Sequence, residues 1–113
     1  MGAITTHVLN TSIGRPGNNI KVDLQYQNGE SWERVGEGIT NDDGRVQKLL
    51  SDTWDLKVGI YKITFSLTNY YKENQIKGFY PEASICFEVL NEKEHFHVPL
   101  LISGHGYTTY RGS

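Results

Sequence analysis

Three histidines and two arginines are the residues of this chain best equipped for chemistry: His7, His95, His97, Arg45 and Arg111. Imidazole titrates near neutral pH, so a histidine can remove a proton from water under physiological conditions. A guanidinium group suits an oxygen-rich ligand and can stabilise negative charge that develops on oxygen. Together these residue types favour hydrolysis of a small polar molecule, provided that the fold brings them together.

A metal site is the alternative use of the histidines. His95 and His97 are two residues apart on one strand, and with His7 they resemble a three-histidine zinc site in ligand type. A two-residue step on a strand is a weak signal, and no carboxylate that could orient these ligands is evident from the sequence. We therefore expect no metal and no cofactor. A metal-dependent hydrolase stays open as an alternative, which the survival of activity after exhaustive chelation would exclude.

The segment Tyr110-Arg111-Gly112-Ser113 combines an aromatic ring, a guanidinium group, a flexible residue and a hydroxyl. All but the glycine can form side-chain hydrogen bonds, and the glycine permits a bend. A frayed polar end is the simpler interpretation for an arbitrary protein. We interpret the segment as part of a binding site because of the residues upstream.

Apolar and polar residues alternate along most of the chain, with turn signals at regular spacing, which predicts an all-β sandwich. One short helix is predicted over 68–75, with Thr68 or Asn69 as its cap and Gly78 beyond its end. About eight strands and this helix would form a Greek-key sandwich, as a single domain over 1–113. The predicted strands are 4–9, 20–26, 32–39, a short one at 46, 60–67, 83–90, 95–102 and 107–111.

Strand geometry assigns the candidate residues to faces. In strand 4–9, Thr5 and His7 share one face and the apolar residues Ile4 and Val8 share the other. In strand 95–102, the even-numbered residues are apolar, so His95 and His97 should point together to the opposite side. Periodicity alone does not show whether these two polar faces meet.

Composition excludes several classes of partner. The chain has 113 residues and a formal charge of −2, and no run of Lys and Arg marks a nucleic-acid surface. No apolar stretch approaches the roughly 18 residues of a membrane span. The single Cys86 fits a reducing compartment, and no secretion signal is evident. We expect a cytoplasmic protein without nucleic-acid or membrane partners, and a peroxisomal location stays open.

Six segments, in order along nearly the whole chain, resemble the transthyretin family, and in particular its enzyme branch, the 5-hydroxyisourate hydrolases. The terminal Tyr-Arg-Gly-Ser is the most specific of them, because the hormone-carrying transthyretins lack it. The segments are Thr5-Thr6-His7-Val8-Leu9-Asn10, Gly14-Arg15-Pro16, Thr40-Asn41-Asp42-Asp43-Gly44-Arg45, Phe79-Tyr80-Pro81, His95-Phe96-His97-Val98-Pro99-Leu100-Leu101 and Tyr110-Arg111-Gly112-Ser113.

The resemblance implies a transthyretin-like Greek-key sandwich of two four-stranded sheets with one short helix. It also implies a homotetramer, a dimer of dimers with the active sites in the groove between the dimers. By motif, the catalytic positions are His7, Arg45, His97 and Ser113. The substrate-binding positions are His7, Arg45, Tyr110, Arg111, Gly112 and Ser113.

The implied reaction is metal-independent opening of the ring of 5-hydroxyisourate by water, in purine (urate) catabolism. The implied product is 2-oxo-4-hydroxy-4-carboxy-5-ureidoimidazoline. On this hypothesis, His7 and His97 activate water, Arg45 and Arg111 bind the ligand and stabilise the oxyanion, and Tyr110 and Ser113 position the ring or the water. The alternative is a transthyretin-like binding protein without catalysis, since a fold alone does not fix function.

Two departures from the family pattern stand out. Asn10 takes the place where the family usually has Asp, which would weaken a local carboxylate contact or turn. The segment 103–107 replaces a more usual Ser-Pro-aromatic turn, so we expect a looser last hairpin.

Overall fold

Alternation of apolar and polar residues builds the strands at the centre of the fold. In β3 (Lys21–Asn28), Val22 and Leu24 are fully buried, whereas Asp23 and Gln25 are only partly covered. β-strands place successive side chains on opposite faces, so this pattern fits one face packed on a core and one face turned outward. The structure is a computed structural model that describes residues 3–113, and Met1 and Gly2 lie outside the described residues.

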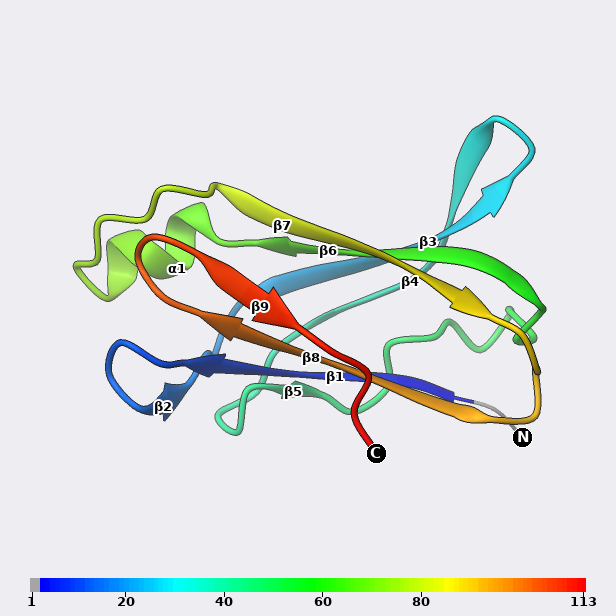
Figure 1. The fold of residues 1–113 in the computed structure, drawn as a ribbon, viewed down its shortest axis with the longest axis horizontal. Coiled ribbons are helices and arrows are strands. Elements are labelled where there is room, and N and C mark those ends of the chain that lie inside the picture. The colour runs from blue at the N-terminus through cyan, green and yellow to red at the C-terminus, as the bar shows by residue number, and fades with distance from the viewer. Residues whose placement is uncertain (1–2) are drawn as a thin grey trace.

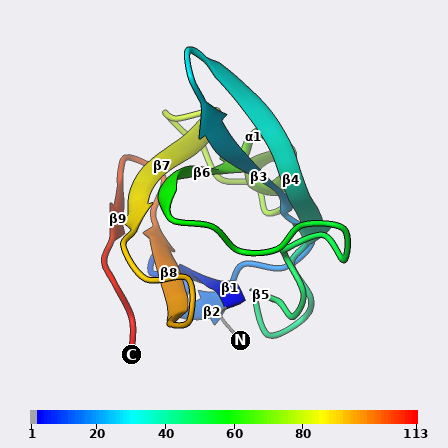
Figure 2. The same ribbon diagram turned by 90° about the vertical axis from the view of Figure 1, so that its right-hand side faces the viewer.

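Two sheets pack face to face, as Figures 1 and 2 show. One sheet has the order β4-β3-β6-β7, and the other has the order β2-β1-β8-β9 with β5 also paired to β1. The all-β sandwich with one short helix is therefore confirmed. The remaining elements are β1 (Ala3–Asn10), β2 (Arg15–Pro16), β4 (Ser31–Ile39), β5 (Arg45–Val46), β6 (Gly59–Ser66), α1 (Thr68–Glu73), β7 (Glu82–Val89), β8 (His95–Ile102) and β9 (Tyr107–Thr109).

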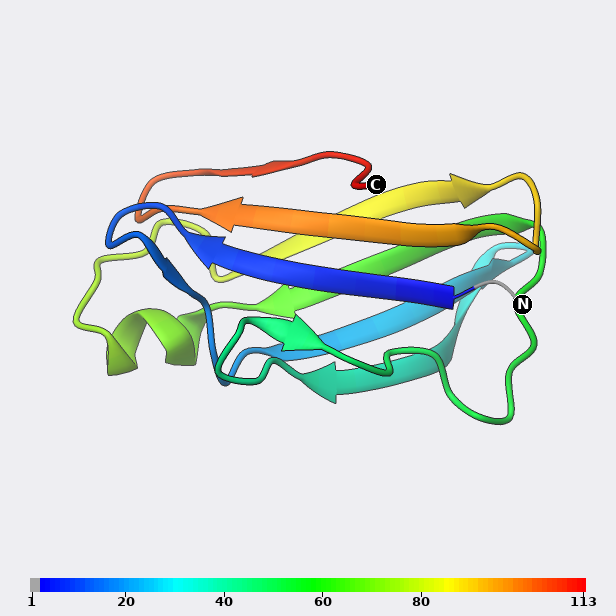
Figure 3. The same cartoon turned by 90° about the horizontal axis from the view of Figure 1, so that it is seen from below.

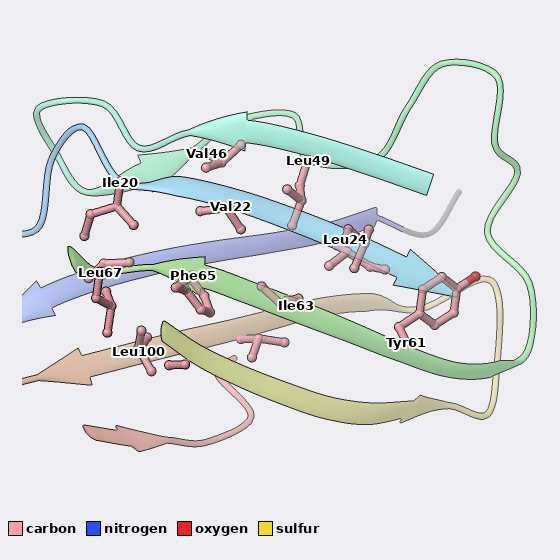
Figure 4. Packing of buried hydrophobic residues seen from close by; sticks show 14 of the residues in the cluster. Ile20, Val22, Leu24, Val46, Leu49, Tyr61, Ile63, Phe65, Leu67 and Leu100 are labelled. Carbon is pink, nitrogen blue, oxygen red and sulfur yellow. The ribbon is translucent and has the colours of Figure 1, made fainter. Parts of the chain in front are cut away.

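The core lies between the sheets, where side chains from both inner faces meet (Figure 4). Ile63 and Phe65 of β6 are fully buried, and so is Leu100 of β8. Phe96 and Val98 are also buried, which confirms that the even-numbered residues of this strand point inward. Their burial leaves the odd-numbered residues His95 and His97 on the outer face.

The pairing of β1 with β8 decides which polar residues become neighbours. The two strands are parallel and lie side by side (Figure 3), with Thr5 opposite His97 and His7 opposite Pro99. On its other edge β1 pairs with two short strands, β2 and β5, one after the other. This sheet therefore has five strands where four were expected, and β2 is the strand that was not predicted.

The structure corrects several predicted boundaries. The helix ends at Glu73, two residues before the predicted end, and Gln75 has a positive φ of 56°. The predicted N-caps were wrong, because Leu67 occupies the N-cap position and no side chain caps the N-terminus of the helix. The last strand ends at Thr109 and not at residue 111, so the following residues are free to turn toward β8.

Asn10 shows how this chain replaces the usual carboxylate. The side chain is fully buried; its Nδ2 donates to the Tyr70 hydroxyl at 2.9 Å and its Oδ1 accepts from the backbone N–H of Ser12 at 3.0 Å. An amide supplies both a donor and an acceptor, whereas an ionised carboxylate only accepts. The Asn10 side chain therefore holds the local turn and also links β1 to the helix.

Among residues 3–113, no helix is long and apolar enough to span a membrane.

Candidate active site

A tight turn fixes Arg45 beside His7. Oδ1 of Asn41 accepts a hydrogen bond from the backbone N–H of Arg45 at 3.0 Å, and Gly44 adopts a positive φ of 76°. The carbonyl of Gly44 then accepts from the N–H of Val8 at 2.8 Å, which ties the turn to β1. Arg45 pairs directly opposite His7 as a result. A side chain at position 44 would press on the Val8 carbonyl, so this approach requires glycine.

His97 is held between β1 and the end of the chain. Its Nδ1 lies 2.8 Å from Oγ1 of Thr5, and its carbonyl accepts from the N–H of Gly112 at 2.8 Å. An added Cβ on Gly112 would lie 2.5 Å from Cδ2 of the His97 ring. The backbone of the tail therefore packs against the imidazole itself, which only glycine permits.

These contacts enclose a shallow hollow of about 310 Å³ on the outer face of the sheet. Its walls include Thr5, Arg45, His95, His97 and Ser113. His7 lies on the same outward face of β1 as Thr5 and is paired with Arg45. The structure thus brings two imidazoles, one guanidinium and the Ser113 hydroxyl to a single hollow, with a third imidazole, that of His7, beside it.

The surroundings of His97 keep its imidazole neutral. Burial lowers the pKa of His97 below the ordinary value of about 6.5, and the nearby Arg45, His7 and His95 lower it further. A hydrogen bond to the backbone of Thr5 acts in the opposite direction and raises this pKa. At neutral pH the ring therefore has a lone pair that can accept a proton, which a general base requires.

Two of the predicted site residues do not point into this hollow. The Arg111 guanidinium donates to Oε1 of Glu94 at 2.9 Å and lies over the Phe96 ring, 4.8 Å from its centre. Tyr110 is 57% exposed. Both residues line a different hollow of about 230 Å³, between β7 and the tail, which His97 also borders. In the single chain the structure therefore separates Tyr110 and Arg111 from His7, Arg45 and Ser113.

The three histidines of the metal alternative do not gather into a ligand set. Among residues 3–113, no three or more His, Cys, Asp and Glu side chains are placed to hold a metal ion together. His95 instead approaches Thr5, whose Oγ1 lies 3.2 Å from His95 Nε2.

Sequence reasoning missed two residues that shape the site, Thr5 and Glu94. The alternation of the first strand places Thr5 on the same face as His7, which was the available signal. Its contact with His97 joins two strands and two residues that are 92 positions apart in the sequence. Glu94 carries no signal of its own in the sequence, because it lies in a polar turn just before β8.

Fold and site together define a transthyretin-like β-sandwich that carries a cluster of ionisable side chains on the outer face of one sheet. The model of the HIUase/Transthyretin family matches residues 4–112. A curated 5-hydroxyisourate hydrolase of Pseudomonas aeruginosa is 36% identical over 117 residues, which cover 100% of this chain and 93% of that protein. The chain belongs to the HIUase/Transthyretin family.

Solved structures are also similar to this chain in fold and sequence. The structure of Klebsiella pneumoniae 5-hydroxyisourate hydrolase is similar to this chain with a TM-score of 0.84 and 30% identity, over 100% of both chains. The crystal structure of an (S)-allantoin synthase is similar with a TM-score of 0.87 and 34% identity over 99% of this chain. This chain spans only 44% of that synthase chain.

Proposed function

We propose that this protein is a 5-hydroxyisourate hydrolase, which opens the six-membered ring of 5-hydroxyisourate with water during urate breakdown. The observation that carries the proposal is the meeting of His97, Arg45 and Ser113 in one hollow, with His7 beside it. The similarity to hydrolases named for this reaction, over the full length of this chain, supports it. A carrier of an apolar hormone has no need for two imidazoles and a guanidinium at this place.

In the proposed reaction, water attacks a ring carbonyl carbon, and the bond from that carbon to the ring nitrogen breaks. His97 or His7 takes the proton from water and returns a proton to the leaving nitrogen. Arg45 stabilises the negative charge on the carbonyl oxygen as it develops. Ser113 positions the ring or the water. The product is 2-oxo-4-hydroxy-4-carboxy-5-ureidoimidazoline, and no cofactor or metal takes part in the proposal.

Tyr110, Arg111 and Gly112 complete the proposed substrate-binding set in a different way. Gly112 places the tail against His97, as its close approach to the imidazole requires. Arg111 is paired with Glu94 in the single chain, so it reaches the ligand in this proposal only by exchanging that partner. Tyr110 is exposed and available to contact the ring.

The direct test is to generate 5-hydroxyisourate with urate oxidase and to follow its ultraviolet decay with and without this protein. We expect strong acceleration, and a loss of about 10²–10⁴-fold on changing His7→Asn if His7 acts in proton transfer. Near-normal turnover of this variant would remove His7 from that role. Binding of the substrate without any acceleration by the unchanged protein would instead identify a non-catalytic binding protein.

We also propose that the chain assembles as a homotetramer, a dimer of dimers with its active sites in the groove between the dimers. The family resemblance supports this assembly, and so do several large apolar side chains that are exposed in the single chain. Native mass spectrometry or light scattering would test it, and a monomer at micromolar concentration would contradict it. The exposed apolar side chains include Ile13, Phe79, Leu90, Tyr107 and Tyr110.

A cytoplasmic location is part of the same proposal. The thiol of Cys86 is free and exposed on β7, which suits a reducing compartment. Imaging of the tagged protein in its own cells would test this, and accumulation in peroxisomes would contradict it.

A further inference from the structure

One hydroxyl group connects two imidazoles at the candidate site. Oγ1 of Thr5 lies 2.8 Å from Nδ1 of His97 and 3.2 Å from Nε2 of His95. Thr5 is on the outward face of β1, directly opposite His97 in the parallel partner strand. His95, two residues before His97, emerges on the same face of β8. The register of the sheet therefore places the three side chains next to one another on one face.

Hydrogen counting restricts how this bridge can be arranged. A threonine hydroxyl has one proton to donate, and it accepts through its lone pairs. It can therefore donate to at most one of the two rings, and at least one ring must donate to it. A neutral imidazole carries its proton on one nitrogen and a lone pair on the other. The direction of the bridge consequently decides which nitrogen of His97 is free.

The placement of the ring selects between the two directions. Nδ1 faces the Thr5 hydroxyl, whereas the ring edge that carries Cδ2 faces the tail beside the hollow. A lone pair that takes a proton in the hollow must therefore be on Nε2, which places the proton of His97 on Nδ1. In this arrangement His97 Nδ1–H donates to the Thr5 hydroxyl, and the hydroxyl donates to Nε2 of His95.

The consequence falls on the other nitrogen of His97. With the proton on Nδ1, Nε2 has the lone pair, and no protein group among residues 3–113 forms a hydrogen bond with Nε2. The ring carbon bonded to Nε2, Cδ2, is the atom that the tail at Gly112 approaches. Nε2 therefore lies on the side of the ring where Ser113 follows.

We propose that Thr5 is a positioning residue that holds His97 in its Nδ1–H tautomer and so makes Nε2 of His97 the general base of the reaction. The role parallels that of the carboxylate that orients histidine in hydrolytic triads, with a neutral hydroxyl and a second imidazole in its place. This inference rests on the proposed hydrolase function for its consequence in turnover. The tautomer itself is a property of the protein without substrate.

The test combines a spectroscopic and a kinetic measurement on three variants. Thr5→Val keeps the branched shape that suits a strand and removes the hydroxyl, whereas Thr5→Ser keeps the hydroxyl. Thr64→Val is the matched control, because Thr64 lies on β6 of the other sheet and its hydroxyl contacts Ser84. Long-range ¹H–¹⁵N correlation spectra above pH 7 report the tautomer of each histidine in the substrate-free protein.

We expect the Nδ1–H tautomer for His97 in the unchanged protein and its loss in Thr5→Val. In Thr5→Val, kcat should fall by about 10-fold or more with KM little changed, because the wrong tautomer presents an N–H to the attacking water. Thr5→Ser should recover the tautomer and most of kcat, and Thr64→Val should alter neither.

An Nε2–H tautomer of His97 in the unchanged protein would overturn the inference, and so would a Thr5→Val variant with normal kcat. The spectra of the unchanged protein decide the matter even if Thr5→Val fails to fold. Failure of the proposed function can be distinguished from failure of this inference, because the spectra report the tautomer of His97 even in a protein without hydrolase activity.

Discussion

Replacing Gly112 by alanine perturbs the contact between the tail and the imidazole of His97. A Cβ at this position would lie 2.5 Å from Cδ2 of the ring and 3.2 Å from Cγ of Pro99. Carbon atoms in contact normally lie about 3.5–4.0 Å apart, so the tail or the ring must retreat by about 1 Å. Pro99 is part of β8 and is held by the sheet, which leaves the tail and the His97 ring to move.

The expected cost to stability is small and the expected cost to turnover is large. Lifting the tail stretches the hydrogen bond from the Gly112 N–H to the His97 carbonyl, which contributes about 0.5–1.5 kcal/mol in typical proteins. A melting temperature lower by about 2–8 °C corresponds to that loss. A displacement of 1 Å between reacting groups can cost about 100-fold in rate. We therefore expect kcat/KM of Gly112→Ala to fall by about 10- to 100-fold.

The assay is the ultraviolet decay of freshly generated 5-hydroxyisourate, with thermal unfolding measured on the same preparations. Gly106→Ala is the matched control, since no atom lies within 4 Å of a Cβ built there and Gly106 is not among the positive-φ residues. It should keep both turnover and melting temperature close to those of the unchanged protein. If Gly112→Ala turns over substrate at the normal rate, the tail does not set the position of His97 and the reasoning is wrong.

Four further predictions concern the tail and the charges at the site. Removing residues 110–113 should abolish turnover and leave the sandwich folded by circular dichroism, because every core residue lies outside the tail; a truncated chain that remains a good hydrolase would contradict this. Burial and, after it, Arg45 hold the pKa of His97 below its ordinary value of about 6.5. Activity should therefore be full at neutral pH and should be lost as the pH falls through this lowered pKa. Changing Arg45→Gln removes one of the lowering charges, so the acidic limb of the kcat/KM profile should move upward while burial still keeps it below about 6.5; an unmoved limb would assign it to another group. Changing Glu94→Gln removes the ion pair with Arg111. This ion pair is exposed and contributes about 0–1 kcal/mol, so turnover should change by no more than about 5-fold. A loss as large as that of the truncated chain would show that Arg111 cannot act without Glu94.

Much of the fold could be predicted because local patterns determine it. The alternation in 95–102 predicted that Phe96 and Val98 would be buried and that His95 and His97 would share the outer face, and the structure confirms it. The first residue of the helix was predicted correctly, but its N-cap and its last residue were not. Its N-cap is Leu67, whose N–H and that of Thr68 bond to the Pro81 carbonyl, so a tertiary contact replaced the side-chain cap that the sequence suggested.

The sequence by itself determined the fold class, the faces on which the candidate side chains lie and the family resemblance. These follow from the two-residue period of strands and from short motifs, which are local properties of the chain. The site residues carried over from the family are a proposal; Arg45, His97 and Ser113 border one hollow, and His7 is paired with Arg45 beside it.

Only the tertiary structure decided which polar faces meet. Thr5 touches His97 because β1 and β8 pair in parallel with one particular register, and that register depends on how the buried residues of both sheets fit together. The same holds for Arg111, which the sequence assigned to the ligand and which the structure pairs with Glu94 over Phe96. Contacts between residues distant in sequence depend on packing across the whole sandwich, and no local pattern encodes them.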